Sequence, residues 1–334
     1  MILKKRVIIF ALVILTVFLS VSAISAMDVN TVDSNSTVLT APDDSISVNE
    51  SNNNVVSYSN VIEENSNNVI GESNQQKAVN LDAPSIEMYY KNGTRFMINL
   101  TDENGIGLAN QSISIVINGV TYNKVTNESG LASMGVNLYS GLYNVTVNYK
   151  GTSEYAPAST TSLIKVIPTI NGDDITKFYR NGTQYYATFL DGYGNPLVNT
   201  TVKFNINGVF YTRDTNDKGV ARLGIQLRPN TYILTAYNPN DGYECANTVK
   251  VLSTVVANDL DENQFYATFL HGDGTPLVNT SVAFNINGVL YHRDTNDKGV
   301  AKLNIKLYPK TYILTAYHPL DGYDVGYTIT VVDS

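Results

Sequence analysis

The sequence contains few of the residues on which most catalytic and redox sites depend. Its 334 residues include no tryptophan, one cysteine (Cys245) and three histidines. A single cysteine excludes a disulfide within the chain, so we expect its folded parts to be stabilised by apolar cores. No Ser-His-Asp set, no G-x-S-x-G or H-E-x-x-H motif and no phosphate-binding glycine loop is present. We therefore expect neither an enzyme nor a cofactor.

Positive charge is also scarce. The chain has 22 lysines and arginines against 30 aspartates and glutamates, which gives a net charge of −8. An acidic chain repels nucleic acids and anionic membrane surfaces, so neither is an expected partner. The expected partner is an unidentified ligand on a cell surface, either a glycan or a protein.

The N-terminus has the pattern of an export signal. Lys4, Lys5 and Arg6 precede an apolar run over 7–26 that ends in small residues. This pattern predicts a signal peptide over 1–26, cleaved after Ala23 or Ala26. The run is also close to the roughly 20 residues that span a bilayer, so an uncleaved signal anchor is the alternative. Either reading places the rest of the chain outside the cell, with membrane contact only through an uncleaved segment.

Residues 27–81 are rich in Asn, Ser, Asp and Glu, with scattered apolar residues. Apolar residues this sparse cannot bury a core that offsets chain entropy, so the composition predicts a disordered spacer. Glycosylation sequons at Asn35 and Asn49 make a glycosylated stalk the alternative.

The remainder of the chain consists of three tandem copies of one sequence repeat. The segment 199–208 recurs at 279–288, and a more diverged copy lies at 110–119. We place the repeats at 82–167, 168–253 and 254–334. Each alternates apolar and polar residues with a period of two, which predicts strands with one buried face. The expected inward positions include Ile113, Ile115, Ile117, Val202, Phe204, Ile206, Val282, Phe284, Ile286 and the sets beginning at Ala132, Ala221 and Ala301.

The turns between these strands favour small two-layer domains. Asn92-Gly93, Asn181-Gly182 and Asn207-Gly208 fit type I′ hairpin turns, in which both central residues have positive φ. About seven short strands in about 80 residues predict an all-β fold of three tandem immunoglobulin-like β-sandwiches. Tyr143, Tyr232 and Tyr312 each begin a strand after a turn, so each is a candidate tyrosine corner.

Three sequence motifs of the second repeat carry a family resemblance. They are G-x-P-L-V-N-T-x-V-x-F-x-I-N-G-V at 194–209, Y-x-R-D-T-N-D-K-G-V-A at 211–221 and P-x-T-Y-I-L-T-A-Y at 229–237. These segments resemble the Ig-like repeats of adhesin-like surface proteins of methanogenic archaea. They are also similar to bacterial Ig-like and carboxypeptidase-regulatory-like modules. The resemblance covers about 82–334 and implies a tandem-domain surface protein without naming its ligand.

Several residues resemble parts of metal-binding, redox or cross-linking sites, but the sequence around them does not favour such sites. The segment 214–219 resembles the start of a calcium loop, but Lys218 and Ile225 occupy ligand positions, so we expect a hairpin turn. The three histidines, His271, His292 and His318, have non-histidine counterparts in the second repeat and are expected on the solvated surface. Cys245 is expected to be a small buried hydrophobe, with an intermolecular disulfide as the alternative. Lys203 is expected on an outward face, which disfavours an isopeptide bond.

Residues expected on the surface are candidates for sugar binding and for glycosylation. Tyr149, Tyr237 and Tyr317 are predicted to point outward, where they can stack on a sugar. Glycosylation sequons recur in the repeats, which makes the exported chain a candidate glycoprotein. The candidate acceptors are Asn92, Asn99, Asn110, Asn127, Asn144, Asn181, Asn199 and Asn279.

Three functional hypotheses follow. The first is a non-enzymatic, adhesin-like surface protein whose tandem domains bind weakly and multivalently. The second is a purely structural spacer or coat of the cell envelope. The third is a module that binds carbohydrate or wall polymer, which requires an exposed aromatic groove in each repeat.

Overall fold

The computed structural model describes residues 7–10, 75–258 and 264–332. Every regular element over these residues is a β-strand, which confirms the all-β prediction. None of the described segments is a helix long and apolar enough to span a membrane. Most of the predicted export signal, the predicted spacer up to residue 74, and the sequons at Asn35 and Asn49 lie outside the described residues.

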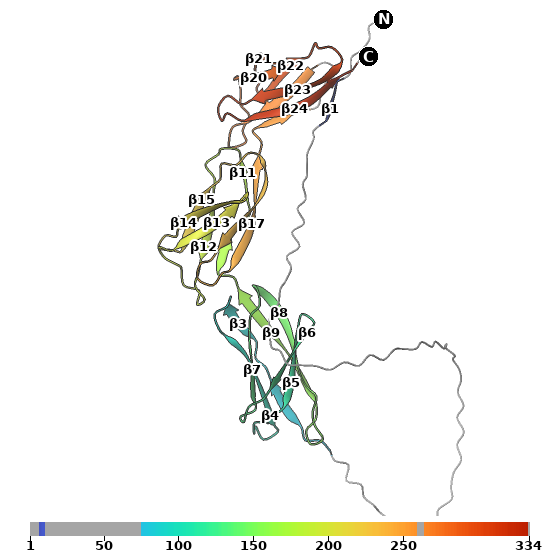
Figure 1. Cartoon of the computed structure of the whole chain (residues 1–334), viewed down its shortest axis with the longest axis vertical. Coiled ribbons are helices and arrows are strands. Elements are labelled where there is room, and N and C mark those ends of the chain that lie inside the picture. The colour runs from blue at the N-terminus through green and yellow to red at the C-terminus, as the bar shows by residue number, and fades with distance from the viewer. Residues whose placement is uncertain (1–6, 11–74, 259–263, 333–334) are drawn as a thin grey trace, which may run out of the picture. The chain divides into compact units, whose positions relative to one another are not determined.

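The second repeat shows the architecture most fully, as two packed sheets (Figure 1). The three-stranded sheet has the order β10-β12-β15, and the five-stranded sheet has the order β11-β17-β16-β13-β14. The strands are Ile170–Gly172 (β10), Ile175–Phe178 (β11), Gln184–Phe189 (β12), Thr201–Ile206 (β13), Val209–Asp214 (β14), Val220–Gly224 (β15), Asn230–Tyr237 (β16) and Glu244–Leu252 (β17).

The first repeat has the same two sheets, ordered β2-β4-β7 and β3-β9-β8-β5-β6. Its strands are Val79–Asp82 (β2), Ile86–Tyr89 (β3), Arg95–Asp102 (β4), Ser112–Ile117 (β5), Val120–Val125 (β6), Leu131–Gly135 (β7), Gly141–Tyr149 (β8) and Ala158–Ile167 (β9). Because β2 pairs with β4 from Val79 onward, the ordered repeat begins before residue 82 and includes the end of the predicted spacer. Lys77 extends it further through a backbone bridge to Tyr155.

This strand order is that of an immunoglobulin-like sandwich. The first strand of each of the first two repeats pairs antiparallel in the small sheet, and the chain then crosses to the large sheet. There β3 and β11 pair in parallel with the last strand of the repeat, β9 and β17 respectively. The remaining pairs are antiparallel, as expected for a sandwich whose two inner faces form the core.

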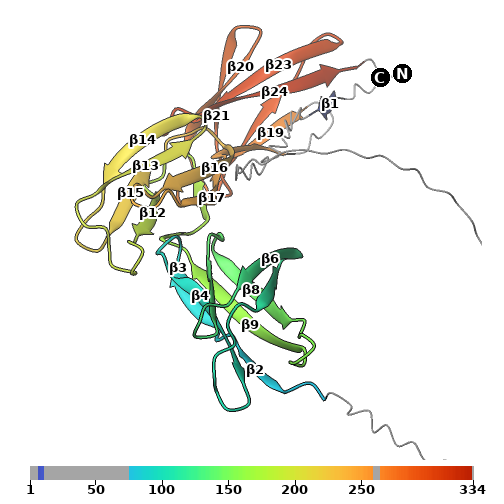
Figure 2. The same ribbon diagram turned by 60° about the horizontal axis from the view of Figure 1, so that its bottom comes forward.

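The third repeat differs at one edge. It contains Val255–Ala257 (β18), Gln264–Phe269 (β19), Ser281–Ile286 (β20), Val289–Asp294 (β21), Val300–Asn304 (β22), Lys310–Tyr317 (β23) and Asp324–Val331 (β24). Its described residues include no counterpart of β3 or β11, and its segment between the first two strands is shorter. The N-terminal strand Val7–Phe10 (β1) pairs with β24 instead, and it lies beside β24 in both views (Figures 1 and 2).

The period-two prediction of the cores is confirmed. Every predicted inward position of β5, β13 and β20 is at most 4% exposed. In the second repeat, the ring of Phe204 packs edge-on against Tyr185 and Phe189, with centroid distances of 5.8 and 5.9 Å. Phe284 packs in the same way against Phe265 and Phe269 in the third repeat. All three repeats keep this alternation although their sequences have diverged, because a shift of a strand's register by one residue would expose all of its apolar side chains.

The turn predictions are confirmed in part. Asn207 and Gly208 both have positive φ, 53° and 76°, as a type I′ turn requires. The prediction was wrong for Asn92-Gly93 and Asn181-Gly182. At both turns the residue before the asparagine, Lys91 or Arg180, has positive φ and the asparagine does not, because the turn links two sheets and is not a hairpin. The Asn92 side chain instead accepts a hydrogen bond from the Thr94 amide.

We expect Gly219→Ala to destabilise the second repeat more than Gly208→Ala. Both glycines have positive φ, which costs alanine roughly 1–2 kcal/mol. A Cβ at Gly208 meets open space, whereas a Cβ at Gly219 lies 2.6 Å from the Phe189 carbonyl oxygen. Displacing that carbonyl weakens its hydrogen bond from the Leu197 amide, at an additional cost of roughly 1–3 kcal/mol. Urea unfolding of the whole chain measures both variants, and equal losses would contradict this account.

Candidate functional site

The outer face of the large sheet in the second repeat carries an exposed apolar patch. Phe210 on β14 and Ile233 on β16 are 60% and 58% exposed. The register places Tyr237 on the same face, and its ring centroid lies 6.0 Å from that of Phe210. The Lys203 ammonium lies 5.5 Å from the centroid of the Phe210 ring, a cation–π contact. We call Phe210, Ile233 and Tyr237 the outer patch of the second repeat.

The third repeat has an outer patch at the equivalent positions, formed by Leu290, Ile313 and Tyr317, which are 55%, 60% and 39% exposed. The position of Lys203 is taken by Ala283, so this patch has no cation above it. In the first repeat the same register positions carry polar residues, namely Thr121, Asn144 and Asn148. The patch is therefore a feature that the second and third repeats share.

Of the patch residues, only Tyr237 and Tyr317 were predicted to point outward, whereas Phe210 and Leu290, which follow the Asn-Gly turns, were not predicted. The signal is present as two successive apolar residues, Val209-Phe210 and Val289-Leu290. A strand with one buried face can bury only one of two neighbours, and here both members of each pair are exposed, by 48–60%. Asn205 pairs with Phe210, and Asn285 pairs with Leu290, which fixes this outward orientation.

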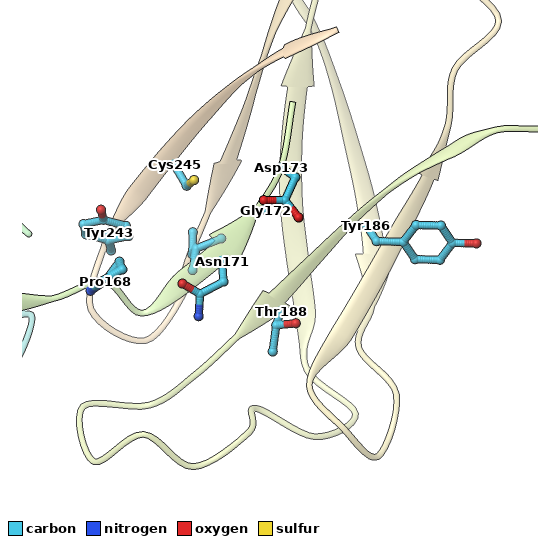
Figure 3. Close-up of a pocket in the computed structure, with 9 residues that line it drawn as sticks. Pro168, Asn171, Gly172, Asp173, Tyr186, Thr188, Tyr243 and Cys245 are labelled. Carbon is cyan, nitrogen blue, oxygen red and sulfur yellow. The ribbon is translucent and has the colours of Figure 1, made fainter. Parts of the chain in front are cut away.

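A second candidate is a hollow of about 470 Å³ in the second repeat (Figure 3). It is lined by Pro168, Ile170, Asn171, Gly172, Asp173, Tyr186, Thr188, Tyr243 and Cys245. The ring of Tyr186 points away from Cys245 and Asn171, so the labelled side chains do not converge on one point (Figure 3). The lining contains a thiol and a carboxylate, but the Cys245 thiol hydrogen-bonds Asn247 Oδ1 and not the Asp173 carboxylate, so the described residues form no nucleophile–base pair here.

Cys245 faces this hollow and is partly buried, which agrees in part with the predicted small hydrophobe. Its thiol donates a hydrogen bond to Asn247 Oδ1 at 3.5 Å. Burial raises the pKa of the Cys245 thiol. Since the thiolate is the nucleophile, a raised pKa disfavours covalent chemistry at neutral pH.

The prediction that all three histidines lie on the surface was wrong for His318, which is 3% exposed. Its Nε2 lies 2.9 Å from the Leu270 carbonyl oxygen, and Nδ1 lies 3.0 Å from an oxygen of Asp321. Asn238 occupies the same place in the second repeat, where its amide donates to the Leu190 carbonyl. The two side chains differ in type but hold the same loop, so their difference does not mark a solvated position.

The prediction of three outward tyrosines was wrong for Tyr149, which is 3% exposed and donates to Gln111 Oε1 at 2.7 Å. The strand register aligns Tyr149 with Asn238 and not with Tyr237. An alignment error of one residue reverses the face of a strand position. Tyr237 and Tyr317 do lie on the outer face, as parts of the outer patches.

The three candidate tyrosine corners share one geometry. The hydroxyls of Tyr143, Tyr232 and Tyr312 donate to the carbonyl oxygen four residues upstream, at 2.9, 2.7 and 2.9 Å. Burial raises the pKa of Tyr232, because its phenolate would be poorly hydrated there. These contacts tie the start of the strand to the preceding turn, which supports the proposed structural role.

Consecutive repeats contact one another through equivalent residues. Tyr243 of the second repeat packs on Tyr90 of the first, with centroids 5.0 Å apart. Its counterpart Tyr323 of the third repeat packs on Tyr179 of the second at 5.1 Å. Ser140 lies 2.5 Å from the Tyr243 hydroxyl, whereas at the other junction Arg228 forms an ion pair with Asp324 at 2.6 Å. Both junctions therefore use the same positions with different polar partners.

The predicted glycosylation acceptors fall into two groups. Those that are exposed are Asn110, Asn127, Asn144, Asn199 and Asn279, whereas Asn92, Asn99 and Asn181 are half-buried. Asn110, Asn199 and Asn279 occupy one position of the three repeats, each with positive φ between 46° and 58°. That recurring position, at a turn before a strand, is sterically open for a glycan.

The described residues hold no cluster of three or more His, Cys, Asp or Glu side chains that could bind a metal ion. The segment that resembles a calcium loop forms a turn, in which Asn216 Oδ1 accepts the amides of Lys218 and Val220. Lys203 is exposed, as predicted.

The chain matches no protein-family model and no curated protein. Among solved structures it is similar to a 1.5-MDa bacterial ice-binding adhesin, with 15% identity, 77% of this chain and 97% of that chain covered, and a TM-score of 0.23. It is also similar to a Bacteroides ovatus protein of a mixed-linkage glucan utilization locus, with 15% identity, coverage of 78% and 67%, and a TM-score of 0.21. Titin domains A168–A170 match with 12% identity, coverage of 76% and 99%, and a TM-score of 0.22.

TM-scores this low support no argument about function, so the fold class rests on strand order and register. On that basis the chain is a tandem array of three immunoglobulin-like β-sandwiches. Two of the three carry the same exposed apolar patch on the outer face of the large sheet.

Proposed function

We propose that this chain is an exported, non-enzymatic, adhesin-like protein whose outer patches bind a surface ligand weakly and together. The observation that carries the proposal is the recurrence of exposed apolar residues at one register position, Phe210 and Leu290, in two repeats. The equivalent register positions of the first repeat carry Thr121, Asn144 and Asn148, so sheet formation alone does not require apolar residues at these positions. Exposed apolar groups cost solubility, and their recurrence favours a role in contact.

The shape of the patch indicates the kind of ligand. The outer face of a sheet is flat, whereas small molecules bind in concave pockets that enclose most of their surface. A flat patch of one phenylalanine, one isoleucine and one tyrosine, as in the second repeat, suits an extended polymer or another protein. Each patch is far smaller than a stable protein interface, so single-site affinity is expected to be weak. Two patches on one chain offset that weakness through linkage.

The proposed location outside the cell rests on the N-terminal sequence, and the recurring exposed sequons at Asn110, Asn199 and Asn279 agree with it. Glycans at this position would decorate one turn of each repeat. The predicted spacer would separate the repeats from the cell if the N-terminal segment is an anchor.

A structural spacer is the second candidate, and the equivalent junctions favour it. Tyr243 and Tyr323 fill the same place between consecutive repeats, as expected for an array built by repetition. The carbohydrate-binding alternative has less support, because Leu290 replaces Phe210 in the third repeat and removes one of the two rings. The spacer and the adhesin differ in whether the outer patches bind anything.

We expect the double variant Phe210→Thr, Leu290→Thr to lose binding to surfaces that retain the native chain. Threonine is the natural choice, because Thr121 occupies this position in the first repeat. The measurement is retention on immobilised cells, glycans and envelope fragments. Leu320→Thr is the control, since it removes an apolar side chain that is 64% exposed in a turn outside the patches.

The control should bind like the native chain. Equal binding by the native chain and the double variant would reject the outer patches as the binding sites. Binding by neither chain on any surface would favour the spacer.

A further inference from the structure

The last strand of the third repeat is an edge strand within its own domain. In the first two repeats the equivalent strand is covered, since Ile86 pairs with Ile164 and Ile175 pairs with Val249. The described residues of the third repeat provide no such strand, so β24 has only β23 as a partner from its own repeat. Its outer row of amides and carbonyls is therefore available for pairing.

The sequence of β24 lacks the features that normally protect an edge. After Asp324 at its first position it reads Val-Gly-Tyr-Thr-Ile-Thr-Val over 325–331, with no lysine, no further charge and no proline. Exposed edges usually carry lysine, proline or a bulge, because an unprotected row of backbone groups is a template for another strand. In the second repeat the edge is covered by β11, yet Lys250 stands where the third repeat has Thr330. The uncovered edge is thus the one without the lysine.

The structure shows that this edge accepts a strand from outside the repeat. Val7 pairs with Val331 and Ile9 pairs with Ile329 in an antiparallel register. This strand belongs to the segment that the sequence predicts to be the export signal. If residues 1–26 are removed on export, the exported chain retains an edge with the same pairing capacity and no partner strand among its described residues.

We propose that in the exported chain β24 pairs antiparallel with β24 of a second copy and forms a two-fold dimer. Antiparallel pairing of a strand with its own copy is symmetric, so each surface supplies what the other requires. The one charged residue of β24, Asp324, lies at its first position and forms an ion pair with Arg228. The alternation of buried Ile329 and Val331 with Thr328 and Thr330 continues across the new pair, which keeps apolar residues on the core side.

Strand addition of this kind gains affinity from main-chain hydrogen bonds and specificity from alternate side chains. The dimer would double the number of outer patches on one particle from two to four. The inference does not depend on those patches, since the edge lies along β24 and the patch residues lie on β21 and β23.

Thr330→Lys tests the proposal with a residue that the fold already tolerates, since Lys250 occupies the same place in the second repeat. Two copies of the variant would bring like charges close together across the two-fold axis, which weakens pairing. Thr311→Lys is the matched control. Thr311 pairs with Thr330 from the neighbouring strand, so it adds the same charge to the same sheet one strand away from the edge.

The measurement is sedimentation velocity of the exported full chain over a range of concentrations, with the N-terminus identified by mass. We expect the exported chain to begin after residue 26 and to form a dimer, and we expect the Thr311→Lys dimer to be equally strong. For Thr330→Lys we expect at least tenfold weaker association, which recovers partly in high salt because salt screens the added charges. A native chain that begins after residue 26 and remains monomeric would overturn the proposal. So would an undiminished Thr330→Lys dimer, or a mature chain that keeps residues 7–10 and is monomeric.

Discussion

Replacing Phe204 by alanine should lower the free energy of unfolding of the second repeat by roughly 3–5 kcal/mol, as for other buried aromatic residues. Phe204 is fully buried, and its ring contacts Tyr185 and Phe189 edge-on from the facing sheet. Truncation removes these contacts and leaves a cavity between two sheets that cannot close freely, because each sheet is held by its own hydrogen-bond ladder. Urea unfolding monitored by tyrosine fluorescence measures the loss.

The neighbouring substitution Lys203→Ala is the control. Lys203 is exposed, and its contact with Phe210 contributes roughly 0.5–1 kcal/mol at such a site. The third repeat already carries Ala283 at this position. A loss for Lys203→Ala as large as that for Phe204→Ala would show that the faces of β13 are wrongly assigned.

Removing a single outer patch should weaken binding far more than the loss of one small contact implies. In the Thr330→Lys background, which should keep the chain monomeric, the native patches engage a surface at two sites, whereas Phe210→Thr leaves only the patch of the third repeat. Linked weak sites exceed a single site by roughly 10²–10⁴-fold when both can engage, so the apparent affinity should fall by this amount. The apparent Kd on the surface selected by the binding screen measures the effect.

Leu290→Thr should cause a similar loss, because it also converts two-site attachment into one-site attachment. Unaltered binding by one single variant and complete loss by the other would place the whole site in one repeat and contradict the multivalent account. Leu320→Thr serves again as the control for a lost exposed apolar side chain.

The cores were predictable from the sequence because their signal is periodic and repeated. Phe204, Ile115 and Phe284 lie at the same phase of an alternation that three copies preserve, and all three are fully buried. The turn at Asn207-Gly208 was predictable for a local reason, since few residues other than Asn and Gly adopt the two positive φ values.

The remaining features depend on contacts between distant segments. In the sequence, the replacement of Asn238 by His318 between repeats is typical of an exposed position. Each side chain is nevertheless buried against a carbonyl 48 residues away, that of Leu190 or Leu270. The Asn92-Gly93 turn has hairpin residues but joins two sheets, so its backbone follows the crossing. The outer patches required knowing which of two adjacent apolar residues pairs outward. The uncovered edge of β24 becomes visible only when the strand partners of all three repeats are compared.

Two similar patches on one chain can bind together only where the ligand is dense enough for both to reach it. The apparent affinities of the chain with native patches and of Phe210→Thr, both in the Thr330→Lys background that weakens pairing of β24 with its copy, are measured on beads that carry the selected surface material at decreasing density. We expect the affinity of the two-patch chain to fall as the ligands become too sparse for both patches to engage, until it equals the density-independent affinity of the single-patch variant. A native affinity that stays constant and higher than that of the variant at every density would contradict the claim.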